Sequence, residues 1–248
     1  PDVHVRSLLA GAWEGRPALW VGTTVGLVRY QEGRWTRYGT PEGLTLPRVG
    51  ALVQTQDPKG GQSLWTGSWG AGVGRLRQGQ WTHFGLASGL PNLAGSALRV
   101  ERGPGQRTWI WAATMGGGLA RLDLADPKES WEVLSTRTHP SLGSNSILRL
   151  EMDRAGRLYA GTSRAVVRIT LPPDRSLGGA KLEPFTLGDG LPTLASTSGA
   201  SLVDHKGHVW FSTPSGAAVL DLDQETPLPS SSTLTWEEIR QGDRILPL

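Results

Sequence analysis

Few residues of this chain have the types and spacing that metal binding or thiol chemistry requires. Its five histidines, His4, His83, His139, His205 and His208, form no HxH or HxxxH pattern. His205 and His208 share one turn, which we interpret as solvent-exposed surface rather than a metal site. The chain has no cysteine, so disulfides, thiol catalysis and Cys-ligated zinc are excluded.

Carboxylates and glycine-rich loops also offer no catalytic arrangement. The acidic residues Glu14, Asp57, Glu101 and Asp153 fall in or near predicted turns, and no two of them are placed for glycoside hydrolysis. The stretches SWGAGVG (68–74) and TMGGGLA (114–120) lack the following helix and lysine of a phosphate-binding loop. The sequence therefore predicts no catalytic residue, no metal and no cofactor.

Composition indicates a β protein with many turns. The 248 residues include 34 Gly, 17 Pro and 11 Trp, but only three Phe and three Tyr. The formal charge of +3 is small and scattered along the chain, which does not indicate nucleic-acid binding. No run of 18 apolar residues occurs, so we expect no segment of this chain to span a membrane.

A repeat of 45 to 51 residues organises the chain. Its anchors are Trp20, Trp65, Trp111, Tyr159 and Trp210. The first unit predicts short strands over 7–13, 19–23, 26–30 and 34–39, and turns with glycine connect them. Three further units repeat this order, and the fifth provides three strands. The period is that of four-stranded propeller blades, so the sequence predicts an all-β propeller with five blades.

Each anchor is expected to pack between adjacent blades. Burial of such a side chain removes roughly 200 Å² from water, worth about 5 kcal/mol before entropy is subtracted. Glycines that follow the anchor, as in Trp20-Val21-Gly22, let neighbouring backbones approach near the axis. We also expect a second set of aromatic residues to be core, on the fourth strands: Trp35, Trp81, Trp131 and Phe185.

The repeat resembles the two-component regulator propeller repeat. The matching stretches are LWVGTTVGLVRY (19–30), DHKGHVWFST (204–213) and the linkers PEGLTLP (41–47), ASGLPN (87–92) and GDGLPT (188–193). The resemblance implies the periplasmic part of a membrane-anchored receptor, such as a hybrid histidine kinase or a diguanylate cyclase. Members of that family usually carry seven blades. Five blades here either close by themselves or form part of a larger propeller.

Three segments are expected along the chain. Residues 1–223 form the propeller repeats, and the polar stretch 224–233 is a linker. Residues 234–248 are either the closing strand of the fifth blade, with Trp236 as its aromatic, or the first hairpin of an immunoglobulin-like domain. The sequence leaves both alternatives open.

Propellers usually bind ligands at the axial opening, which is lined by inter-blade loops and by turns between second and third strands. Trp69 departs from the repeat, so we expect it to be at least partly exposed, on the same face as Arg164. Arg164 is the only charge among those turns. The predicted ligand-binding residues are Trp69, Arg164, Met115, Thr24, Arg48, Asn92 and Asn145.

The resemblance and these residues together predict a non-catalytic periplasmic sensor that binds a small molecule or oligosaccharide and acts within a homodimer. Two alternatives remain. The stretch GHVWFSTPSG (207–216) is also similar to blades of streptogramin-type lyases, for which His139 is the histidine that could approach the axis. The third hypothesis is a protein-interaction scaffold.

Overall fold

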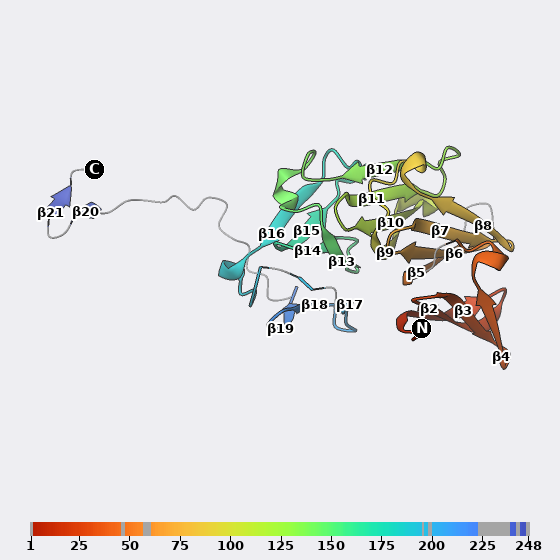
Figure 1. The fold of residues 1–248 in the computed structure, drawn as a ribbon. Helices are drawn as coiled ribbons and strands as arrows, with labels where there is room; N and C mark the ends of the chain where they lie inside the picture. Colours follow the sequence, from red (N-terminus) through yellow and green to blue (C-terminus); the bar gives the residue numbers. More distant parts are fainter. Residues whose placement is uncertain are drawn as a thin grey trace.

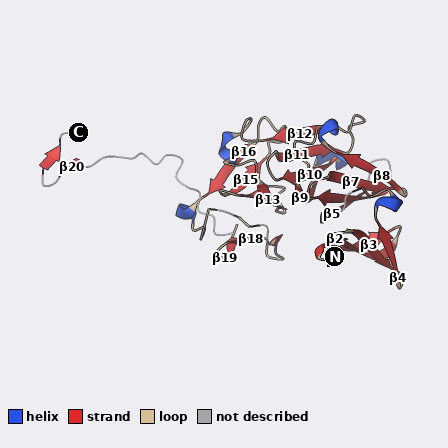
Figure 2. Ribbon diagram, viewed as in Figure 1, coloured by secondary structure: helices blue, strands red, loops and turns tan. Residues whose placement is uncertain are grey.

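The computed structural model describes residues 2–45, 48–56, 61–194, 196–197 and 200–222, together with the backbone of 239–241 and 244–246. Five antiparallel sheets are arranged like propeller blades (Figure 1). Strands account for the regular structure, and the helices of the described residues are single 3-10 turns (Figure 2). The all-β, five-blade prediction is confirmed.

Four blades have four strands each. Blade one contains β1 (Val5–Trp13), β2 (Arg16–Thr23), β3 (Gly26–Gln31) and β4 (Arg34–Tyr38). Blade two contains β5 (Val49–Gln56), β6 (Gln62–Ser68), β7 (Gly72–Arg77) and β8 (Gln80–Phe84). Blade three contains β9 (Gly95–Arg102), β10 (Thr108–Thr114), β11 (Gly118–Asp123) and β12 (Trp131–Leu134). Blade four contains β13 (Ile147–Met152), β14 (Leu158–Thr162), β15 (Val166–Thr170) and β16 (Lys181–Phe185).

Blade five has three strands among the described residues. They are β17 (Ser201–Val203), β18 (Val209–Thr213) and β19 (Gly216–Leu220). The strands β20 (Ile239–Gln241) and β21 (Arg244–Leu246) pair with each other in a separate two-stranded sheet. Trp236 and the predicted linker 224–233 lie outside the described residues, so the two alternatives for the C-terminal segment stay predictions.

Five single 3-10 turns occur among the described residues. They are η1 (Thr40–Glu42), η2 (Leu86–Ser88), η3 (Pro104–Gln106), η4 (Pro140–Leu142) and η5 (Leu187–Asp189). Four of them follow the fourth strand of a blade, and η3 lies between the first and second strands of blade three. Each of η1, η2 and η5 ends at a glycine with positive φ, namely Gly43, Gly89 and Gly190. These are the glycines of the linkers that the sequence resemblance singled out.

The first strand of each blade lies innermost, beside the first strand of the next blade. Strand β5 packs against β1, β9 against β5, β13 against β9, and β17 against β13. Among the described residues, β17 and β1 show no comparable packing, so blades one and five are the two ends of the array (Figure 1). The five blades therefore form an open series in this structure.

The anchors occupy equivalent places, as predicted. Trp20, Trp65, Trp111 and Tyr159 are at most 1% exposed. Each pairs across the sheet with an arginine of the third strand: Arg29, Arg75, Arg121 and Arg168. Trp210 pairs with Val219 at the same register and is half-buried, because no further blade covers it in the described part of the chain.

Close backbone approach explains the glycine after the anchor. A Cβ atom added to Gly22 would lie 2.6 Å from the carbonyl oxygen of Val49 in the next blade. A Cβ atom added to Gly161 would lie 2.6 Å from the hydroxyl oxygen of Ser196. Both separations are shorter than van der Waals contact, so a side chain at either position would push the blades apart.

Most anchors also donate a hydrogen bond to the end of the first strand or the turn after it. The pairs are Trp65 Nε1 with Thr55 (3.0 Å), Trp111 Nε1 with Glu101 (2.5 Å), Tyr159 OH with Asp153 (3.1 Å) and Trp210 Nε1 with Asp204 (3.0 Å). Burial, followed by the charge of Asp153, raises the pKa of Tyr159. The sequence analysis gave Glu101 and Asp153 no role, and the structure shows that they satisfy buried donors.

The third-strand arginines form a second repeated feature that the sequence analysis missed. Arg75 lies 5.3 Å from the ring centre of Trp65, and Arg121 lies 5.4 Å from that of Trp111. Each also forms an ion pair with a carboxylate, Arg75 with Glu129 and Arg121 with Glu132. The Arg121–Glu132 pair joins two strands of blade three, whereas the Arg75–Glu129 pair joins blade two to the segment before β12 of blade three. The pattern combines cation–π stacking with charge neutralisation.

The predicted fourth-strand aromatic set needs two corrections. Trp35 is 62% exposed and contacts Tyr30 (ring centres 4.8 Å apart), because blade one has no preceding blade in the described chain. Phe185 is not equivalent to the tryptophans. It pairs with Val166, and the residue at the tryptophan position of blade four is Leu182. The chain inserts extra residues before β16, which displaced the sequence alignment by three positions.

Candidate ligand-binding site

A cavity of about 730 Å³ opens where the inner strands begin, and we call it the axial cavity. Residues of blades one, two, four and five line it. Its lining residues are Asp2, His4, Val5, Arg6, Thr24, Val25, Arg48, Gly50, Trp69, Arg149 and Ala200. The structure thus brings together three of the predicted binding residues: Thr24, Arg48 and Trp69.

The same local structure in four blades positions the turn residues. The main-chain N–H of Trp69 donates to the carbonyl of Arg48 (3.3 Å), just before β5. The equivalent bonds elsewhere join Thr24 to His4 (3.0 Å), Met115 to Ala94 (3.0 Å) and Ser163 to Ser146 (3.2 Å). The turn is therefore held against the start of its own inner strand. The blade-four counterpart of Trp69 is Ser163, the residue before the predicted binding residue Arg164.

Trp69 is 42% exposed, in agreement with the predicted partial exposure. Its indole lies over Gly50, since a Cβ atom at Gly50 would be 3.2 Å from both Cδ1 and Nε1 of the ring. Gly50 is the extra residue of a β-bulge between Val49 and Ala51. A bulge and a glycine together leave room for a flat side chain beside the inner strand.

Positive charge predominates in the axial cavity. Arg6, Arg48 and Arg149 line it, and Asp2 is its one acidic lining residue among those described. No hydrogen bond or ion pair of the Arg6 or Arg48 side chain occurs in the described part of the chain. Burial, and then repulsion from Arg99, lowers the pKa of Arg149, while Glu151 opposes that shift.

Glu151, on the same strand as Arg149, is held by partners from the two neighbouring blades. It accepts hydrogen bonds from Arg99 (Nε, 3.1 Å) and from the hydroxyl of Ser201 (2.6 Å). The carboxylate is nearly buried, with a side chain 6% exposed. It therefore links blade three to blade five beneath the cavity instead of lining it.

The other predicted site residues lie outside the axial cavity. Asn92 and Asn145 stabilise inter-blade loops: Asn92 Oδ1 accepts from the amide of Ala94 (2.8 Å), and Asn145 Oδ1 accepts from the amide of Thr136 (2.7 Å). Met115 forms an isolated bridge with Ser146. Arg164 is exposed on the β14–β15 turn and is not a lining residue of the cavity.

Histidine placement also differs from expectation. His139 precedes η4, where its Nδ1 lies 3.0 Å from the hydroxyl of Thr138, and it does not line the axial cavity. His4 lines the cavity instead. Its backbone is fixed by a pair of hydrogen bonds with Thr24. The sequence analysis did not place His4 near the axis, because His4 precedes the first recognisable strand of the repeat.

Arg149 is the lining residue that sequence reasoning missed most clearly. Its register partner is Gly161, the glycine after the anchor of blade four. The equivalent positions of the other blades carry small residues: Ser7, Ala51, Ala97 and Ala200. That departure from the repeat was visible in the sequence once the inner strands were aligned in register.

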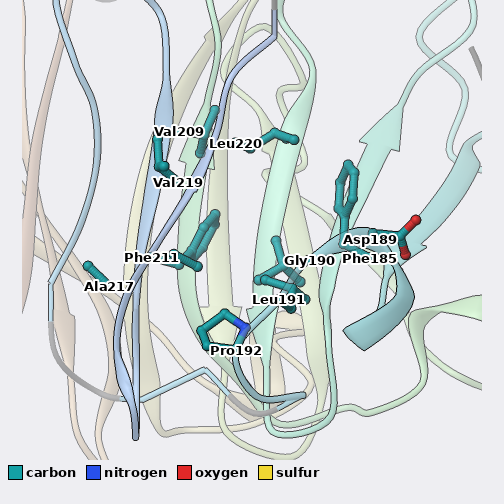
Figure 3. A pocket seen from close by; sticks show the side chains of 12 residues that line it. Phe185, Asp189, Gly190, Leu191, Pro192, Val209, Phe211, Ala217, Val219 and Leu220 are labelled. Carbon is teal, nitrogen blue, oxygen red and sulfur yellow. The ribbon is translucent and has the colours of Figure 1, made fainter. Parts of the chain in front are cut away.

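A second cavity, of about 310 Å³, lies between blades four and five (Figure 3). Its walls are apolar side chains such as Phe185, Leu191, Phe211 and Leu220, and Asp189 is the one charged residue among the described residues that line it. Figure 3 shows these side chains around the linker that continues from η5.

Comparison with other blades explains this second cavity. Gly43 and Gly89 contact Trp81 and Trp131 of the following fourth strand, at 3.4 Å and 3.8 Å from an added Cβ atom. The equivalent Gly190 has no atom within 4 Å of such a position in the described part of the chain. The cavity is therefore the space that a fourth strand fills in complete blades, and it suits packing better than recognition of a polar ligand.

The described residues form neither a metal-binding cluster nor a membrane-spanning helix. No group of three or more His, Cys, Asp or Glu side chains is placed to hold a metal ion. Among those residues there is also no helix with the length and hydropathy needed to cross a membrane.

No family model matches the chain, and no curated protein matches it either. Solved structures do match. The extracellular domain of BT3049 from B. thetaiotaomicron, named as a hybrid two component system, has a TM-score of 0.69 at 19% identity over 89% of this chain. The corresponding domain of BT4673 has a TM-score of 0.56 at 17% identity over 87% of this chain. The chain has the fold of these propellers.

The chain spans only part of those sensor proteins, 28% of the BT3049 chain and 27% of the BT4673 chain. A third propeller, virginiamycin B lyase from Staphylococcus aureus, has a TM-score of 0.54 at 18% identity. That alignment covers 91% of this chain and 76% of the lyase. Identities this low establish the propeller fold and carry no activity with them.

Proposed function

We propose that this propeller is the extracytoplasmic ligand-binding part of a signal-transduction protein, and that it binds a small molecule or oligosaccharide without transforming it. The observation that supports this proposal best is the axial cavity with Trp69 at its wall. Its volume of about 730 Å³ falls within the usual range of small-molecule sites, roughly 300 to 1,000 Å³. An exposed indole offers a stacking surface for a sugar ring.

The neighbours named as two-component systems are extracellular domains, which favours the same location for this propeller. Signalling would follow from the position of the cavity between the ends of the blade series. A ligand that contacts blades one, two, four and five favours one spacing of those blades over others. In the proposed homodimer, this change in blade spacing would change how the two receptor chains lie beside each other.

A second candidate function is a lyase, which the likeness to virginiamycin B lyase favours. Such an enzyme needs a histidine and a carboxylate at the axial opening. His4 and Asp2 both line the axial cavity and are exposed, whereas His139 does not line it. If the chain is a lyase, His4 rather than His139 is the general base or acid.

One experiment separates the two functions. Purified protein is titrated calorimetrically with a panel of oligosaccharides and macrocyclic lactones, and each mixture is then analysed by mass spectrometry. The sensor proposal predicts saturable binding with every ligand recovered unchanged. Turnover that is lost in His4→Ala and kept in His139→Ala would replace the sensor by the lyase.

A further inference from the structure

Arg149 stands where the repeat otherwise keeps a small side chain. Four blades have Ser7, Ala51, Ala97 and Ala200 at this position on the inner strand. The fold therefore does not require an arginine there, and alanine serves at three of the four positions. The packing of the blade therefore does not explain a long cationic side chain at this position.

Two further arginines line the same cavity from other elements. Arg6 is the bulge residue of β1, where blade two has Gly50 and blade three has Ser96. Arg48 immediately precedes β5, where blade three has Ala94. Neither Arg6 nor Arg48 has an ion-pair partner in the described part of the chain. The three cationic residues thus all depart from the repeat and all line one cavity.

Like charges that share a cavity repel one another, and the effect is larger where solvent is partly excluded. Arg149 is only half-exposed and carries the further repulsion of Arg99. Among the described residues, Asp2 is the single carboxylate that lines the cavity with these three guanidinium groups, and Glu151 beneath the cavity offsets part of the charge of Arg149. A negatively charged ligand would relieve this imbalance, and guanidinium groups bind carboxylate and sulfate with paired, directed hydrogen bonds.

We propose that the axial cavity selects an anionic saccharide, with a sugar ring stacked on Trp69 and its carboxylate or sulfate groups bound by Arg149, Arg6 and Arg48. This inference rests on the proposed function and specifies its ligand class. A neutral sugar of the same shape would retain the stacking on Trp69 but would bring no counter-charge to Arg6 and Arg48.

The test compares a neutral trisaccharide with two acidic trisaccharides of the same ring stereochemistry. β-1,4-Linked mannuronate trisaccharide and β-1,4-mannotriose share ring stereochemistry, and a sulfated mannotriose provides the other oxyanion. Calorimetric titration should give at least about tenfold tighter binding for one or both acidic sugars than for mannotriose. The preference should shrink as sodium chloride is raised.

Arg149→Ala is the decisive variant, because alanine occupies the equivalent position in three blades and the variant is expected to fold. It should weaken binding of the acidic sugar roughly 10- to 100-fold and leave mannotriose binding unchanged. Arg164→Ala is the matched control, since Arg164 is exposed outside the cavity. Arg164→Ala should change neither the affinity for the acidic sugar nor the affinity for mannotriose.

A second readout does not depend on the choice of sugar. The melting temperature is measured in sodium sulfate and in sodium chloride at equal ionic strength. The stabilisation by sulfate should be larger for the wild-type chain than for Arg149→Ala, whereas Arg164→Ala should match the wild type.

The outcomes separate this inference from the proposed function. If mannotriose binds as tightly as the acidic sugars, or if Arg149→Ala and Arg164→Ala behave alike, the anionic ligand class is wrong and the sensor proposal stands. If no sugar binds and the sulfate effect is the same in all three proteins, the ligand class is wrong and the axial site loses its support.

Discussion

The indole of Trp69 packs across Gly50, the bulge residue of the inner strand in the same blade. An added Cβ atom would stand 3.2 Å from the ring, closer than ordinary contact. Gly50→Ala should therefore tilt the indole and weaken ligand binding several-fold, with little change in melting temperature. Gly178→Ala is the control, because a Cβ atom there meets nothing within 4 Å. Equal affinities for the two variants would show that the ligand does not use the observed position of Trp69.

The Glu101 carboxylate is predicted to be indispensable for stability. It is fully buried, accepts from Trp111 Nε1 (2.5 Å) and from Arg175 Nε (2.7 Å), and links blade three to the loop after β15. Glu101→Ala leaves a buried donor and a charged guanidinium without this partner, which should cost about 3 to 5 kcal/mol in urea unfolding. Arg16→Ala, which breaks the exposed pair with Glu32, should cost at most about 1 kcal/mol. Similar costs for both would contradict the burial of Glu101.

Trp35 and Trp131 occupy equivalent positions of the repeat but differ in burial, 62% against 8% exposed. Trp131→Ala should destabilise the chain by about 3 to 5 kcal/mol, because it leaves a cavity between blades. Trp35→Ala should cost less than about 1 kcal/mol, since this tryptophan contacts mainly Tyr30. Urea unfolding measures both. A large cost for Trp35→Ala would mean that the free face of blade one is covered in solution.

Stability should depend on pH through Asp204. Hydrogen bonding from Trp210 Nε1 first, and then from the amides of His208 and Lys206, lowers the pKa of this carboxyl to about 2. A carboxyl group whose pKa is lower in the folded state stabilises the fold above its unfolded pKa of roughly 3.9, and that contribution is lost as pH falls towards 2. The difference in unfolding free energy between the wild type and Asp204→Asn should therefore shrink between pH 4 and pH 2. A difference that stays constant over this range would contradict the bonded carboxylate.

The blades could be predicted from the sequence because each anchor recurs with the same turn and strand pattern around it. Trp20, Trp65 and Trp111 are buried as expected, and the close approach at Gly22 follows the predicted physics. Phe185 shows where prediction from the repeat pattern fails. Residues inserted between β15 and β16 moved the register, and spacing alone could not show which aromatic faced which neighbour.

The site was predicted only in part, for a related reason. Trp69, Thr24 and Arg48 were found because loops near the axis can be located from the repeat. Arg149 was missed because it lies within a strand, where the sequence analysis looked for packing instead of ligands. Asn92 and Asn145 do not line the axial cavity, and both accept hydrogen bonds from backbone amides, as polar residues in loops often do.

The central claim is that ligand binds in the axial cavity against Trp69. Its most direct test measures affinity and melting temperature of Trp69→Ala beside those of Trp35→Ala, another exposed tryptophan outside the cavity. Binding should weaken by about 1 to 3 kcal/mol in Trp69→Ala alone, with nearly unchanged melting temperatures in both variants. Unchanged affinity together with a large fall in the melting temperature of Trp69→Ala would show that this tryptophan serves the fold and that the ligand binds elsewhere.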